Sequence, residues 1–148
     1  MRTLGIDYGL KRIGLALSDA GGKLATPLEV LEVTSEDVVI SGILELIERE
    51  DVRRIVVGLP LNMDDTLGPG VKKAVQFGRA LAGRSHCEVL YVDERLSTFD
   101  AEQTLNSRKR SGEKITRKGK KRQLDAIAAA RFLQEYLDGK LAPINPPA

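Results

Sequence analysis

Three acidic residues stand at positions where a carboxylate needs an explanation. Asp7 lies inside an apolar run that predicts a strand, Glu94 closely follows a second such run, and Asp125 precedes an alanine-rich stretch. A lone buried charge is costly unless it is paired or bound to a metal ion. Three separated carboxylates that converge are suited to one or two Mg²⁺ or Mn²⁺ ions, which take oxygen ligands. Such a centre can activate water for attack on a phosphodiester bond without a histidine base.

Each of the three acids also has a purely structural interpretation. Asp7 can form a salt bridge with Lys11 or Arg12 in the turn that follows it, and Glu94 can pair with the arginine next to it. Asp125 can be a surface acid near a helix N-terminus, where the helix dipole favours a negative charge. Residue types alone leave both interpretations open.

Basic and polar residues suited to a phosphate backbone accompany these acids. Between Arg108 and Arg122 there are nine basic residues and one acid, although the whole chain has a net charge of only +2. Such a concentrated basic segment is typical of a protein that binds a polyanion, and a solvated loop is the structural alternative. The candidate nucleic-acid-binding residues are Lys11, Arg12, Asn62, Thr66, Arg95, Arg108, Lys109, Arg110, Lys118, Lys121 and Arg122.

Length and composition restrict the class of protein. A chain of 148 residues with 42% hydrophobic but only 4% aromatic residues predicts one domain with an aliphatic core. Cys87 is the only cysteine, so no internal disulfide forms, and with a single histidine a structural zinc site is not expected. No apolar run is long enough to span a bilayer, and the N-terminus lacks a signal-peptide pattern. We therefore expect a cytoplasmic protein with no membrane partner.

The elements that must position these residues follow from hydrophobic periodicity and turn residues. Strands are predicted over residues 2–8, 12–18, 24–33, 54–59 and 88–92, and helices over 35–50, 71–84, 98–107 and 120–137. The first two strands suit a tight hairpin, and Pro27 predicts an edge position or a bulge for the third. Helices between the later strands imply parallel pairing there. We expect an α/β fold with a mixed five-stranded sheet flanked by helices, in one domain over 1–138, and a loosely ordered tail over 139–148.

Four segments of the sequence form linked motifs that together resemble a known family. They are Gly5-Ile6-Asp7-Tyr8-Gly9-Leu10-Lys11-Arg12-Ile13-Gly14 with Ser18-Asp19, Val57-Gly58-Leu59-Pro60-Leu61-Asn62-Met63-Asp64, Asp93-Glu94-Arg95-Leu96-Ser97-Thr98, and Leu124-Asp125-Ala126. In this order, over about residues 1–137, they resemble the YqgF family. Its members are described as Holliday-junction resolvases or as nucleases that process the precursor of 16S ribosomal RNA.

The resemblance implies a ribonuclease H-like fold and a metal-dependent endonuclease. The family's metal-binding catalytic acids fall on Asp7, Glu94 and Asp125. Processing of the 5′ end of the 16S rRNA precursor is the leading expectation, and cleavage of four-way DNA junctions is the alternative. A junction resolvase needs two active sites and hence a homodimer, whereas RNA trimming needs only a monomer.

Two details of the motifs stay open. Asp65 stands where the family pattern leads us to expect a glycine, which adds an acid to the loop beside the expected phosphate site. Ribonuclease H-like sites often have a fourth acid, and Asp19, Asp64 and Asp93 are all candidates.

Two functions of other classes compete with the nuclease. The run Gly5-Ile6-Asp7-Tyr8-Gly9 also resembles the first phosphate loop of sugar kinases and actin-like ATPases, but those need two lobes to enclose ATP. A non-catalytic RNA-binding module is the other alternative. It would gain nothing from three carboxylates that repel phosphate, so we prefer the nuclease.

Overall fold

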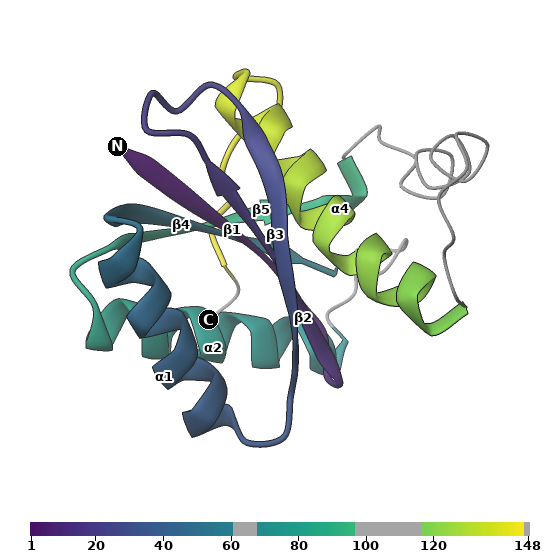
Figure 1. The fold of residues 1–148 in the computed structure, drawn as a ribbon. Helices are drawn as coiled ribbons and strands as arrows, with labels where there is room; N and C mark the ends of the chain where they lie inside the picture. The colour runs from purple at the N-terminus through teal and green to yellow at the C-terminus, as the bar shows by residue number, and fades with distance from the viewer. Residues whose placement is uncertain (61–67, 97–116, 147–148) are drawn as a thin grey trace.

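A computed structural model describes residues 1–60, 68–96 and 117–146 of the chain. It has five strands in one mixed sheet, in the order β3-β2-β1-β4-β5, as the sequence predicts (Figure 1). The strands are β1 (Arg2–Tyr8), β2 (Arg12–Ser18), β3 (Ala25–Glu32), β4 (Val52–Leu59) and β5 (Glu88–Asp93). The described helices are α1 (Glu36–Arg49), α2 (Pro69–Arg84), the 3₁₀ helix η1 (Glu94–Leu96) and α4 (Arg117–Leu137). The predicted helix over 98–107 lies outside the described residues.

The opening strands form the antiparallel half of the sheet. β1 pairs with β2 across the predicted hairpin, and β2 pairs with β3, which is an edge strand. The register of β2 and β3 shifts between the pairs Leu15↔Glu29 and Ala16↔Pro27. Pro27 therefore lies on an edge strand and at a bulge, the two settings that the sequence predicts for it. In both settings the backbone does not need the N–H group that proline lacks.

The later strands pair in parallel, and helices cover both faces of the sheet. β4 lies between β1 and β5 and is parallel to both. In Figure 1, α1 and α2 lie on one face and α4 crosses the other. Ile55, Val57 and Leu59 of β4 are fully buried, which explains the continuous apolar run of this strand. The larger core lies on the α1 and α2 side of the sheet and contains Phe77.

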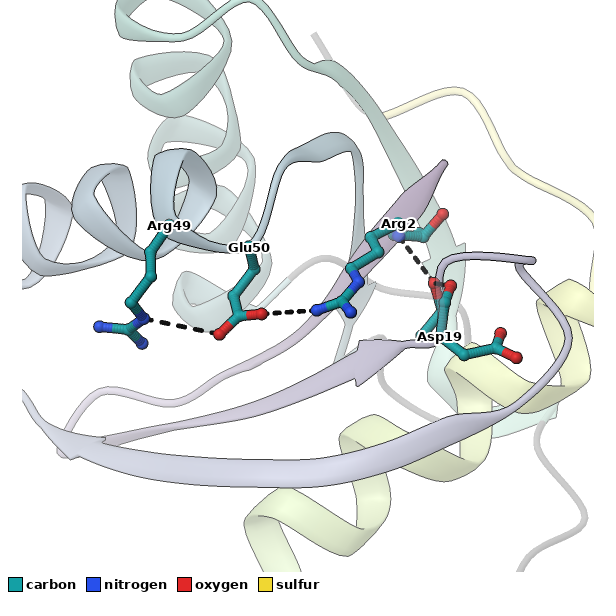
Figure 2. Close-up of polar contacts among 6 residues, drawn as sticks. Arg2, Asp19, Arg49 and Glu50 are labelled. Carbon is teal, nitrogen blue, oxygen red and sulfur yellow. Dashed lines mark hydrogen bonds and ion pairs between the residues drawn. The ribbon is translucent and has the colours of Figure 1, made fainter.

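Charged side chains connect the start of β1 to the residues at the end of α1 and just beyond it. The Arg2 guanidinium donates to Glu50, just beyond α1, with an N–O distance of 2.5 Å (Figure 2). Arg49 also lies beside Glu50, at 3.5 Å. α1 begins after Ser35, as predicted, although the Ser35 side chain makes no capping hydrogen bond. This cluster lies at the end of β1 remote from Asp7.

Small residues on both partners let α4 lie close to the sheet. Ala126, Ala129 and Ala130 are buried, as expected of an alanine-rich helix that packs on a sheet. On the sheet side, a Cβ added to Gly5 would lie 3.1 Å from Leu133 of α4. A Cβ added to Gly14 would overlap the backbone of Asp125. The glycines of β1 and β2 therefore fix how near α4 can come.

The residues after α4 pack on the domain, where the sequence predicts a loosely ordered tail. Leu141 is 3% exposed, and the Ile144 N–H donates to the Tyr91 carbonyl at 2.8 Å. The buried Leu141 side chain and the backbone hydrogen bond to Tyr91 of β5 hold this segment against the domain. The division into a domain over 1–138 and a tail over 139–148 stays a prediction. Within the described part of the chain, no helix is long and apolar enough to cross a bilayer.

Candidate active site

Asp7 lies near the carboxyl end of the central strand β1, between two glycines. Its register partners are Gly14 on β2 and Gly58 on β4. Both neighbours lack a side chain, so the space on either side of the Asp7 carboxyl group on the α4 face is open to groups from elsewhere. The apolar residues on either side of Asp7 in the sequence form the strand that carries this carboxylate.

Glu94 reaches Asp7 across a strand that separates them. It is the first residue of η1, directly after β5, and β4 lies between β5 and β1. A Cβ on Gly58 would lie 3.0 Å from Glu94 Oε2 and 2.8 Å from the Phe132 ring. Because Gly58 has no side chain, the Glu94 side chain can pass over β4 and contact Asp7.

The two carboxyl groups are in hydrogen-bond contact and both resist ionisation. The pKa of Asp7 is raised well above its ordinary value, mainly by desolvation and then by the charge of Glu94, their hydrogen bond and the charge of Asp125. Desolvation is also the largest cause of the raised pKa of Glu94; the hydrogen bond with Asp7 acts in the opposite direction, and the charges of Asp93 and Asp125 raise the pKa further. Both residues keep part of their surface accessible, but the carboxyl groups themselves are closely surrounded by protein. The site therefore favours a proton or a cation.

Asp125 lies beside this pair but is engaged by an arginine. Its Oδ2 is 3.1 Å from Nε of Arg12 at the start of β2. The sequence suggested Arg12 as a salt-bridge partner of Asp7, but in the structure Arg12 pairs with Asp125. The contact of Gly14 with the Asp125 backbone brings α4 close enough for this ion pair.

The three acids fit a divalent cation in chemistry but are not all arranged around one point. Their donors are carboxylate oxygens, as Mg²⁺ and Mn²⁺ require, and the charge of Asp125 acts on both Asp7 and Glu94. Yet among the described residues no three Asp, Glu, His or Cys side chains form a group that could hold a metal ion. In this arrangement the carboxylate of Asp125 is engaged by Arg12.

The candidates for a fourth acid have other partners or lie elsewhere. Asp93 is 5% exposed and makes a bidentate pair with Arg95, whose Nη2 is 2.7 Å from Oδ2, and this lowers the pKa of Asp93. Asp19 lies just past the far end of β2, where its Oδ1 accepts the N–H groups of Lys23 and Leu24. The third candidate, residue 64, and the departure at residue 65 lie outside the described residues.

The structure describes only part of the predicted nucleic-acid-binding set. Lys11 is exposed at the hairpin tip, Arg12 contacts Asp125, and Arg95 contacts Asp93. Lys118, Lys121 and Arg122 belong to the first turns of α4 by their backbone, and nothing more is described of them. The remaining members, Asn62, Thr66, Arg108, Lys109 and Arg110, lie outside the described residues.

Gly14 and Gly58 are the residues of the site whose roles the sequence did not reveal. Each interrupts a strand of apolar residues, which is the usual sign that another group approaches the backbone closely. That signal was present in the sequence. It did not say which group approaches, because Asp125 and Glu94 come from distant segments.

The raised pKa values predict how the stability of the metal-free protein depends on pH. Because the folded state binds protons on Asp7 and Glu94 more tightly than the unfolded chain, the free energy of unfolding should rise as the pH falls through the folded pKa values. The rise should end near about pH 4, where the carboxyls of the unfolded chain also titrate and the lowered pKa of Asp93 acts in the opposite direction. Thermal unfolding in EDTA at a series of pH values measures this. An Asp7→Asn variant should show a smaller rise, and equal slopes in both proteins would contradict the assignment.

Comparisons with known proteins identify the family of the chain. The model of a family named RuvX, described as Holliday junction resolvase, matches residues 1–139. A protein of Lactiplantibacillus plantarum named "Putative pre-16S rRNA nuclease" is 39% identical over 145 residues, covering 95% of this chain and 98% of the relative. A protein of Bacillus thuringiensis with the same name is 40% identical over 142 residues, covering 95% of this chain and all of the relative.

Solved structures agree with the predicted ribonuclease H-like fold. RuvC of Thermus thermophilus in complex with a Holliday junction substrate superposes with a TM-score of 0.62 at 19% identity, covering 97% of this chain and 99% of that one. The fowlpox virus resolvase, solved with Holliday junction DNA, superposes with a TM-score of 0.54 at 11% identity, covering 94% of this chain and 98% of that one. At these identities the likeness concerns the fold.

Proposed function

The chain belongs to the RuvX family of Holliday junction resolvases, which is the YqgF family that its motifs resemble, and we propose that it is a metal-dependent endonuclease. The observation that carries the proposal is the contact between Asp7 and Glu94, two desolvated carboxyl groups brought together near the carboxyl ends of β1 and β5. A structural pair of this kind would be destabilising without a cation, because like charges in contact repel and desolvation is not repaid. A functional site explains why the fold keeps it.

Asp7, Glu94 and Asp125 would hold the divalent cation, Mg²⁺ or Mn²⁺. When bound, one or two such ions supply a nucleophilic water and neutralise the charge that develops on the phosphate and the leaving oxygen. The chain itself contributes the ligands and orients the substrate. Arg12, beside the acids, is placed to contact a phosphate, and the exposed Lys11 can contact the next stretch of backbone.

We propose the precursor of 16S rRNA as the substrate, cleaved near its 5′ end in the cytoplasm. The support comes from the relatives at 39% and 40% identity, whose names specify that RNA. A four-way DNA junction is the second candidate, supported by the family's description and the fold of the junction-bound resolvases. Few aromatic side chains are available to stack on bases, so recognition should rest on backbone and shape in either case.

Cleavage of the two substrates by one preparation tests this choice. With Mg²⁺ or Mn²⁺, we expect a labelled 16S precursor to be cut at a defined position and a four-way junction to be cut much more slowly. Mass photometry with each substrate should show one copy of the chain on the RNA, because trimming needs only one active site. Symmetrical cutting of the junction by a dimer would reverse the choice. Binding of RNA without cleavage under any divalent cation would favour a non-catalytic module.

A further inference from the structure

We propose that Arg12 exchanges its partner during substrate binding, from the Asp125 carboxylate to a phosphate of the nucleic acid, and that this exchange releases Asp125 to complete the metal site. The inference rests on the proposed nuclease function. It assigns Arg12 as a positioning residue, since it acts on the metal through Asp125.

The first support is the state of the three acids in the structure. Asp7 and Glu94 already meet, whereas the Asp125 carboxylate binds Arg12 at 3.1 Å, and the described residues contain no three-acid metal group. Gly14 holds the backbone of Asp125 against β2. The acid is thus fixed near the site by its backbone, and only its side chain has to change partner.

The second support is that the ion pair is easy to exchange. The side chains of Arg12 and Asp125 are 23% and 31% exposed, so solvent screens the contact. Ion pairs that solvent reaches contribute little to stability. The Arg12 side chain makes no other hydrogen bond to a described residue, and a guanidinium binds a phosphate through two parallel hydrogen bonds. A substrate phosphate can therefore replace the carboxylate at little cost.

The consequence is a metal site that becomes complete only on nucleic acid. Before the substrate binds, Arg12 neutralises Asp125, and only Asp7 and Glu94 would be available to hold a cation. After it binds, the phosphate takes the guanidinium and the third carboxylate is free. Metal binding and substrate binding should then strengthen each other, because the same ion pair opposes both.

A double-mutant cycle on metal affinity tests the exchange without relying on cleavage. Mn²⁺ binding is followed by electron paramagnetic resonance in wild type, Asp125→Asn, Arg12→Gln and the double variant, with and without a phosphorothioate-substituted precursor RNA. In free wild type, Asp125→Asn should weaken Mn²⁺ binding by less than about threefold. In the Arg12→Gln background, or with RNA bound to wild type, the same change should weaken it at least about tenfold.

The outcomes separate the exchange from simple electrostatics and from the proposed function. If Arg12 acts only through its charge, Asp125→Asn costs as much or more in free wild type as in Arg12→Gln, which would overturn the exchange. Arg2→Gln is the matched control, since it breaks another half-buried arginine–carboxylate pair, with Glu50, far from the site (Figure 2). It should leave Mn²⁺ affinity unchanged. Absence of Mn²⁺ binding and of cleavage in wild type would instead refute the nuclease.

Discussion

Asp7→Asn should abolish cleavage, by at least about a thousandfold, and at the same time raise the thermal stability of the metal-free protein. A thousandfold loss corresponds to about 4 kcal/mol of transition-state stabilisation, which is a reasonable share for a ligand at the centre of a metal site. The gain in stability has a separate cause. Desolvation and the charge of Glu94 make an ionised Asp7 unfavourable in the fold, and the neutral amide removes that penalty.

The two effects are measured on the same samples. Single-turnover cleavage with Mn²⁺ gives the loss of activity, and thermal unfolding in EDTA near neutral pH gives the change in stability. Mn²⁺ should raise the melting temperature of wild type but not of Asp7→Asn, because a ligand stabilises only the state that binds it. Asp51→Asn is the control, since Asp51 is exposed in a turn at φ 52° that asparagine also adopts. Cleavage retained in Asp7→Asn would refute the site.

Gly14→Ala should be among the most damaging single changes to stability. An added Cβ would overlap backbone atoms of Asp125, which cannot move aside as a flexible side chain can. We expect a loss of about 3 kcal/mol or more, at the upper end of the range for overpacked interiors. Because α4 must shift away from β2, Asp125 should also leave the site, and cleavage should fall even at temperatures where the variant is folded.

Urea unfolding measures the change in free energy, with Gly42→Ala as the matched control. Gly42 lies in α1 with no atom within 4 Å of an added Cβ, so the same substitution there should stabilise the protein by up to about 1 kcal/mol. The contrast separates the effect of close packing from that of glycine itself. Equal stability of Gly14→Ala and wild type would mean that α4 does not approach β2 as described.

Most of the fold was predictable because its signals are local. The apolar runs gave five strands within a few residues of their observed bounds, and Pro27 correctly indicated an edge and a bulge. α2 begins at Pro69, two residues before the predicted start, since proline is accepted in the first turn of a helix. The cost of burying Asp7 was also visible, because a carboxylate inside an apolar strand stands out in the sequence itself.

The arrangement of the site was not predictable, because it depends on contacts between distant segments. Arg12 and Asp125 are 113 residues apart, and nothing near either residue indicates that they meet. Arg95 forms a bidentate pair with Asp93, which the sequence could not single out because Arg95 follows two acids in a row. The roles of Gly14 and Gly58 appear only once the strand register is known. A single sequence shows that close approaches occur and does not show between which residues.

The location of the metal tests the central claim most directly. Crystals of the protein with bound nucleic acid, soaked in Mn²⁺, should show anomalous scattering between the carboxyl groups of Asp7, Glu94 and Asp125, and no such signal in Asp7→Asn. A manganese ion bound elsewhere, with these three carboxylates still paired to protein groups, would contradict the account.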